Sequence, residues 1–81
     1  MTVYLRFLCG EIVGSARHGA YHVEAGSTVA QLMAAAAAEN GTFREGYLDF
    51  LLFQVNSRFA AQDCVLHEGD RVTALRLAYG G

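Results

Sequence analysis

The printed sequence ends with Gly80 and Gly81, and these two residues are the best suited to chemistry in which the backbone itself reacts. Because glycine has no Cβ, such a tail can enter a channel too narrow for any other residue and present a terminal carboxylate to a second protein's active site. Four residues beyond Leu77, fully extended, would reach about 13–14 Å. On the tail alone two interpretations stay open, a Gly-rich end without a role and a reactive tail.

Few other residues could support catalysis or metal binding. His18 and His22 are four residues apart, but the third ligand that a metal site needs is missing. Cys9 and Cys64 are too few and too far apart for a metal motif or a disulfide framework, so we expect free packing thiols. The chain has no phosphate-binding Gly-rich loop and no carboxylate cluster for Mg²⁺. We therefore expect no bound cofactor, no metal and no catalysis by this chain alone.

Composition excludes several classes of function. With 81 residues, 53% of them hydrophobic, the chain can form one domain with a thin core. A net charge of −2 without clustered basic residues argues against nucleic-acid binding. No apolar run of about 18 residues and no signal peptide is present, so we expect a cytoplasmic protein that does not bind membranes. All six basic residues are arginines, which excludes poly-chains linked through the protein's own lysines.

The N-terminal half predicts a hairpin followed by a helix. Residues 3–9 alternate in polarity, which predicts a strand with Tyr4, Arg6 and Leu8 on its outward side. The glycines at positions 10 and 14 predict a loop, and residues 20–24 predict a second strand, antiparallel to the first. Thr28 and Gln31 have the spacing of a capping box, and apolar residues then recur at helical spacing up to Asn40-Gly41.

The C-terminal half predicts three more strands. These are residues 50–55, a short strand over 59–61 after a turn at 56–58, and a final strand from Arg71 after a turn at 67–70. If the helix is the crossover, the last strand can lie beside the first in the centre of the sheet. The order predicts an α+β fold of the β-grasp (ubiquitin-like) type, with a mixed sheet of four to five strands packed on one main helix. We expect this domain over residues 1–77 and a flexible Gly-Gly tail over 78–81.

Three motifs resemble the MoaD/ThiS family of ubiquitin-like sulfur carriers. They are the turn in Val55-Asn56-Ser57-Arg58-Phe59, the entry Leu66-His67-Glu68-Gly69-Asp70-Arg71-Val72 into the last strand, and the terminal Gly80-Gly81. Together they cover about a third of the chain, and its length is closest to the small subunit of molybdopterin synthase. The molybdopterin branch usually has a proline before the Gly-Gly, whereas this chain has Tyr79 there and contains no proline.

The resemblance implies a specific chemistry at the tail. An E1-like enzyme would bind ATP and Mg²⁺, adenylate the Gly81 carboxylate, and allow sulfur to form a thiocarboxylate, while Gly80 would give access to the channel. The sulfur would then serve molybdenum cofactor biosynthesis, with the molybdopterin synthase large subunit as a partner. Alternatives are a sulfur carrier for another pathway such as thiamin or cysteine, a ubiquitin-like protein modifier, and a β-grasp interaction domain that forms no conjugates.

Partner binding would need an exposed surface beside the tail. If the inward residues of the first and last strands face the helix, Leu8 and Leu75 face outward, and Phe59 lies at the edge of the same face. These three residues form a candidate apolar patch, of the kind that marks interfaces. The alternative for Phe59 is a place in the core. Arg76 and Tyr79 are candidate contacts for the partner's channel, or else solvated residues.

Overall fold

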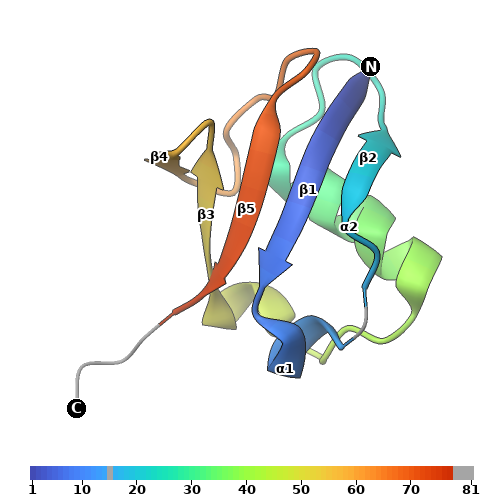
Figure 1. The fold of residues 1–81 in the computed structure, drawn as a ribbon, viewed down its shortest axis with the longest axis vertical. Helices are drawn as coiled ribbons and strands as arrows, with labels where there is room; N and C mark the ends of the chain where they lie inside the picture. The colour runs from blue at the N-terminus through green and yellow to red at the C-terminus, as the bar shows by residue number, and fades with distance from the viewer. Residues whose placement is uncertain (15, 78–81) are drawn as a thin grey trace.

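The computed structural model describes residues 1–14 and 16–77 (Figure 1). Within these residues the chain forms five strands, two α-helices and one 3-10 helix, η1. In chain order they are β1 (Thr2–Leu8), α1 (Gly10–Val13), β2 (Gly19–His22), α2 (Val29–Asn40), η1 (Tyr47–Phe50), β3 (Leu51–Val55), β4 (Arg58–Ala60) and β5 (Arg71–Arg76).

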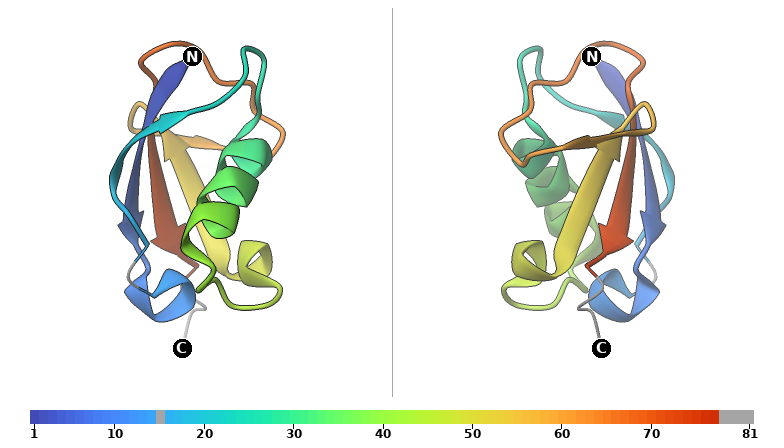
Figure 2. Two further views of the ribbon diagram at one scale, coloured as in Figure 1. Left: turned by 90° about the vertical axis from the view of Figure 1, so that its right-hand side faces the viewer. Right: turned by 90° about the vertical axis from the view of Figure 1, so that its left-hand side faces the viewer.

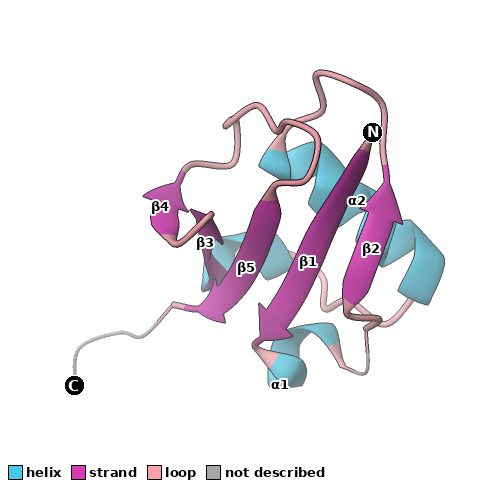
Figure 3. Ribbon diagram, turned by 45° about the horizontal axis from the view of Figure 1, so that its top comes forward, coloured by secondary structure: helices cyan, strands magenta, loops and turns pink. Residues whose placement is uncertain are grey.

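The strands form one mixed sheet in the order β2-β1-β5-β3-β4 (Figures 1 and 3). β5 is last in sequence but central in space: it runs parallel to β1 and antiparallel to β3. The β1–β2 and β3–β4 pairs are antiparallel hairpins. Because a parallel pair needs a crossover connection, the intervening helix is what allows β5 to lie beside β1. The predicted β-grasp arrangement is confirmed.

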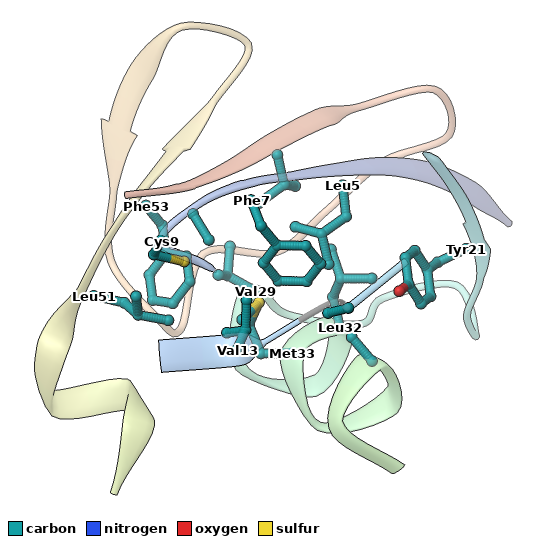
Figure 4. Packing of buried hydrophobic residues seen from close by; sticks show 14 of the residues in the cluster. Leu5, Phe7, Cys9, Val13, Tyr21, Val29, Leu32, Met33, Leu51 and Phe53 are labelled. Carbon is teal, nitrogen blue, oxygen red and sulfur yellow. The ribbon is translucent and has the colours of Figure 1, made fainter. Parts of the chain in front are cut away.

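Helix α2 packs across one face of the sheet, and the core lies between the two layers (Figures 2 and 4). The helix contributes Val29, Leu32, Met33 and Ala36, all fully buried. The odd-numbered residues of β1 point toward them, as the alternation predicted. Among the described residues, the buried core consists of Val3, Leu5, Phe7, Cys9, Ile12, Val13, Ala16, Tyr21, Val29, Leu32, Met33, Ala36, Leu51, Phe53, Leu66, Val72 and Ala74.

The ends of α2 have the local interactions that the sequence predicted. The Thr28 hydroxyl accepts the Gln31 backbone N–H at 3.2 Å, and the Gln31 side chain accepts the Thr28 N–H at 2.8 Å. At the other end Gly41 adopts a left-handed conformation with φ of 66°. Both interactions satisfy backbone groups that a helix end leaves free, so they fix where the helix starts and stops.

The loop predicted around Gly10 and Gly14 is wrong, because residues Gly10–Val13 form the helical turn α1. Ile12 and Val13 are buried on its inner side, so burial of two apolar side chains outweighs the poor helix propensity of glycine. Other differences are shifts at element ends: β1 stops at Leu8, and β2 ends before Val23, which is half-buried.

The opposite face of the sheet carries no helix in the described residues (Figure 2). We call it the outer face. It displays Tyr4, Arg6 and Leu8 of β1, all exposed. Within residues 1–14 and 16–77, no helix is long and apolar enough to cross a membrane.

Candidate functional site

The central strand β5 fixes the path of the chain toward its C-terminal residues. Its ladder with β3 continues past the strand end, where the Leu77 N–H donates to the Phe50 carbonyl at 2.8 Å. The chain is therefore tied to the sheet as far as the last described residue. The predicted tail residues Tyr79, Gly80 and Gly81 lie outside the described residues, so their roles stay predictions.

A row of three leucines crosses the outer face beside this point. The register pairs Leu75 of β5 with Leu8 of β1 on one side and with Leu52 of β3 on the other. Leu8 is 54% exposed and Leu52 40% exposed, while Leu75 is half-buried between them. Directly opposite residues in a sheet have neighbouring side chains, so the three form a continuous apolar strip, which we call the leucine row.

The leucine row confirms one prediction and adds a residue. Leu8 and Leu75 do face outward together, as the alternation of their strands predicted. Leu52 was missed, although its position between the buried Leu51 and Phe53 already placed it on the outer face. Exposed apolar residues in contact with one another mark interaction surfaces, whereas single ones do not, and the added leucine makes the strip three strands wide.

Phe59 also lies on the outer face, but it is not part of the leucine row. It is 71% exposed, so the alternative that placed it in the core is wrong. On the edge strand β4 it pairs with Gln54, one row away from the leucines and diagonal to Leu52. The structure thus brings Leu8 and Leu75 together, whereas one strand, β3, separates Phe59 from Leu75, and two strands, β3 and β5, separate it from Leu8.

The side chain of Arg76 pairs with helix α1. Its Nη1 lies 2.8 Å from Oε1 of Glu11, with 65% and 56% of the two side chains exposed. An ion pair this exposed contributes little to stability, because water solvates both partners and salt screens them. Arg76 is therefore held by a contact that a partner's carboxylate can replace, and Glu11 is a residue that sequence reasoning missed.

A small cleft of about 190 Å³ lies beside Leu77, just past the end of β5. Arg44 and Arg76 lie in its wall, together with Phe50 and Leu77. The Arg44 guanidinium carbon is 5.6 Å from the centre of the Phe50 ring, within the range of a cation–π contact. The sequence did not predict a role for Arg44. The segment between α2 and β3 has no clear periodicity, so nothing in it indicated that Arg44 would approach the end of β5.

The described residues contain no group of three or more His, Cys, Asp or Glu side chains that could hold a metal ion. Both cysteines are free, as predicted; Cys9 is buried and Cys64 half-buried. Burial raises the pKa of the Cys9 thiol, and burial likewise raises the pKa of the Tyr47 hydroxyl. A raised pKa makes the Cys9 thiolate scarcer, so this sulfur is poorly suited to nucleophilic chemistry.

Solved structures with the same fold include a protein modifier and subunits of molybdopterin converting factors. The chain superposes on SAMP1 of Haloferax volcanii, a small archaeal modifier protein, with a TM-score of 0.77 and 19% identity over 100% of both chains. It superposes on a Pyrococcus furiosus protein assigned as molybdopterin converting factor subunit 1 with a TM-score of 0.71 and 15% identity, over 96% and 99% of the two chains.

A third match comes from a complex of subunits 1 and 2 of the molybdopterin-converting factor of Helicobacter pylori. It has a TM-score of 0.60 and 22% identity over 100% of both chains. No protein-family model and no curated protein sequence matches this chain. At these identities the comparisons establish the fold: the chain has the ubiquitin-like β-grasp fold, which SAMP1 and the molybdopterin converting factor subunit 1 share.

Proposed function

We propose that this protein is a sulfur carrier for molybdopterin (molybdenum cofactor) biosynthesis, activated at the carboxylate of Gly81. The observation that carries the proposal is the position of β5, which leads from the centre of the sheet past the leucine row to Leu77, four residues before Gly81. A partner that binds the leucine row would receive the following residues directly. This chemistry requires Gly81 to be the last residue of the mature chain, because only a terminal residue has a free backbone carboxylate.

Activation is needed because a carboxylate is a poor electrophile, its negative charge being delocalised over both oxygens. In the proposed first step a Gly81 carboxylate oxygen attacks the α-phosphorus of ATP and pyrophosphate leaves. A sulfur nucleophile then attacks the acyl carbon of the adenylate and AMP leaves, so that one oxygen of Gly81 is replaced by sulfur. An E1-like enzyme would supply the site for ATP and Mg²⁺.

The chain's own residues would dock and present the tail. The leucine row would bind the activating enzyme and then the synthase large subunit or an equivalent acceptor enzyme. Gly80 and Gly81 would enter the channel because neither has a Cβ. Arg76 and Tyr79 would contact the channel wall, with Arg76 exchanging Glu11 for a carboxylate of the partner.

A second candidate function is protein modification, in which the activated Gly81 forms an amide with a lysine of a target. The superposition on SAMP1, a modifier, supports protein modification as much as the superpositions on the molybdopterin converting factor subunits support a sulfur carrier. Both functions share the adenylate and differ in the nucleophile that attacks it. The chain itself has no lysine, so a conjugate would have to form on another protein.

Intact mass spectrometry separates these functions. The purified chain would be incubated with an E1-like enzyme of its source organism, ATP, Mg²⁺ and a sulfide source. A carrier gains the mass difference between sulfur and oxygen on its C-terminal peptide, whereas a modifier appears joined to a lysine with loss of water. A chain lacking Gly81 is the matched control and stays unchanged. An unchanged mass of the full chain, with the enzyme active on another carrier, would exclude the carrier function, and the absence of a conjugate when lysine-containing target proteins are added would exclude the modifier.

A further inference from the structure

Charge is distributed unevenly between the sheet and the rest of the molecule. The chain has a net charge of −2, yet none of its eight Asp and Glu residues lies in a strand. Four of its six arginines do lie in strands, namely Arg6, Arg58, Arg71 and Arg76. The strands of the sheet therefore carry only positive charges, although the protein as a whole has a negative net charge.

Two of these arginines lie side by side on the outer face. The register pairs Tyr4 with Arg71 and Arg6 with Thr73, so that the two guanidinium groups belong to neighbouring strands and successive rows. The Arg71 guanidinium carbon lies 5.7 Å from the centre of the Tyr4 ring, which favours a position over that ring. Both arginines are exposed.

Neither arginine has an acidic partner within the part of the chain that the structure describes. The ion pairs there involve Arg17, Arg76 and His67. Arg6 and Arg71 instead line a depression of about 420 Å³ on the outer face, together with Tyr4, His18, Asn56 and Thr73. Guanidinium groups bind carboxylates through two parallel hydrogen bonds, so two unpaired arginines in one depression are suited to acidic side chains.

This depression continues the leucine row. Along β1 and β5 the rows read Leu8 with Leu75, then Arg6 with Thr73, then Tyr4 with Arg71. The outer face is therefore apolar at the end of β5 and cationic at the start of β5. An apolar centre beside a charged rim is the usual composition of a protein–protein interface, in which the charges set orientation and association rate.

We infer that the protein which receives the tail docks through an apolar surface flanked by Asp or Glu side chains, and that these carboxylates pair with Arg6 and Arg71. The inference rests on the proposed function, because it describes the partner of that same tail. The pairing of carboxylates with these arginines would orient the partner. Because the leucines lie at one end of β5 and the arginines at the other, the partner can bind in only one direction along β5, the direction that leads the tail into the partner's active site.

The test measures association of the full chain with the E1-like enzyme at low and high salt. We expect Arg6→Glu and Arg71→Glu each to lower the association rate about tenfold or more at low salt, with a smaller difference at high salt. Arg58→Glu is the matched control, because Arg58 is exposed and pairs with the inward Val55, and so points away from the outer face. Arg6→Lys keeps the charge and should retain most of the rate.

Three results would overturn the inference: unchanged association of both reversed variants, an equal loss for Arg58→Glu, or a salt-independent loss. Binding of inorganic phosphate to the free chain, lost in Arg71→Glu while enzyme association stays normal, would assign the depression to a small anion instead. If the wild-type chain is activated normally and the variants behave like it, only this inference fails. If the wild-type chain is never activated, the proposed function fails and the inference fails with it.

Discussion

The side-chain amide of Asn56 donates a hydrogen bond to Oδ1 of Asp70 at 2.9 Å. Asn56 Oδ1 also accepts the Arg71 backbone N–H at 3.0 Å, and Asp70 Oδ2 accepts the His67 N–H at 2.8 Å. Two of the motifs that carry the family resemblance therefore meet in space, although 14 residues separate them. Together they fix where β5 begins against the β3–β4 turn, and hence the register that builds the leucine row.

Asn56→Ala should weaken this junction. It removes both side-chain hydrogen bonds and places alanine at a φ of 52°, a left-handed conformation that alanine disfavours. We expect a loss of about 1–3 kcal/mol in the free energy of unfolding, measured by urea denaturation. Asn56→Gly loses the same hydrogen bonds but tolerates the backbone conformation, so its loss reports the bonds, and the difference between the two variants isolates the backbone strain of alanine. Wild-type stability in both would mean that the junction does not hold β5.

Ser57→Gly should stabilise the protein. Ser57 has a φ of 71°, and the second position of such a tight hairpin turn favours glycine. We expect a gain of about 0.5–1 kcal/mol in the free energy of unfolding. The reverse change, Gly41→Ala, should lose a similar amount, because Gly41 has a φ of 66° and no atom within 4 Å of an added Cβ. A loss of stability in Ser57→Gly would contradict the strain assigned to this turn.

Gly81 should matter for chemistry and not for folding. Deletion of Gly81 is expected to abolish the mass change with the activating enzyme and leave the thermal unfolding midpoint unchanged, because the buried core of residues 1–14 and 16–77 ends at Ala74, before the last strand does. Gly81→Ala is expected to act alike by blocking the channel. Unfolding of the deletion variant would show that the tail is structural, and would remove the basis of the carrier proposal.

Leu8→Glu and Leu52→Glu should weaken binding of the activating enzyme about tenfold or more while changing the free energy of unfolding by less than about 1 kcal/mol. Leu75→Glu should cost more stability, because Leu75 is half-buried and a carboxylate there loses hydration. Val65→Glu is the control, since Val65 is 49% exposed but lies outside the sheet. Equal affinity loss in Val65→Glu would contradict a role specific to the leucine row.

Cys9 should resist alkylation in the folded protein. It is 3% exposed and burial raises its thiol pKa, so at a given pH its thiolate fraction is lower than that of an ordinary cysteine. With iodoacetamide near pH 8 we expect one adduct, on the half-buried Cys64. A second adduct should form only in denaturant or at higher pH, as peptide mass spectrometry would show. Rapid labelling of Cys9 in the native protein would contradict its burial.

Local patterns determined most elements of this fold. The alternation of β1, the capping box of Thr28 and Gln31, and the left-handed turn at Asn56 each depend on residues within a few positions of one another, so each could be predicted. The α1 turn could not, because its glycine signal favours a loop and only the core that buries Ile12 and Val13 reverses it.

The candidate site divides in the same way. The sequence by itself determined that a strand precedes Gly80-Gly81 and that Leu8 and Leu75 face away from the helix, since strand alternation is a local property. Only the tertiary structure decided that Leu52 completes their row, that Phe59 lies apart from it, and that Glu11 pairs with Arg76. Those relationships depend on the parallel pairing of β1 with β5 and on the register of β3 against β5, which join residues too far apart in the chain for any local pattern to link.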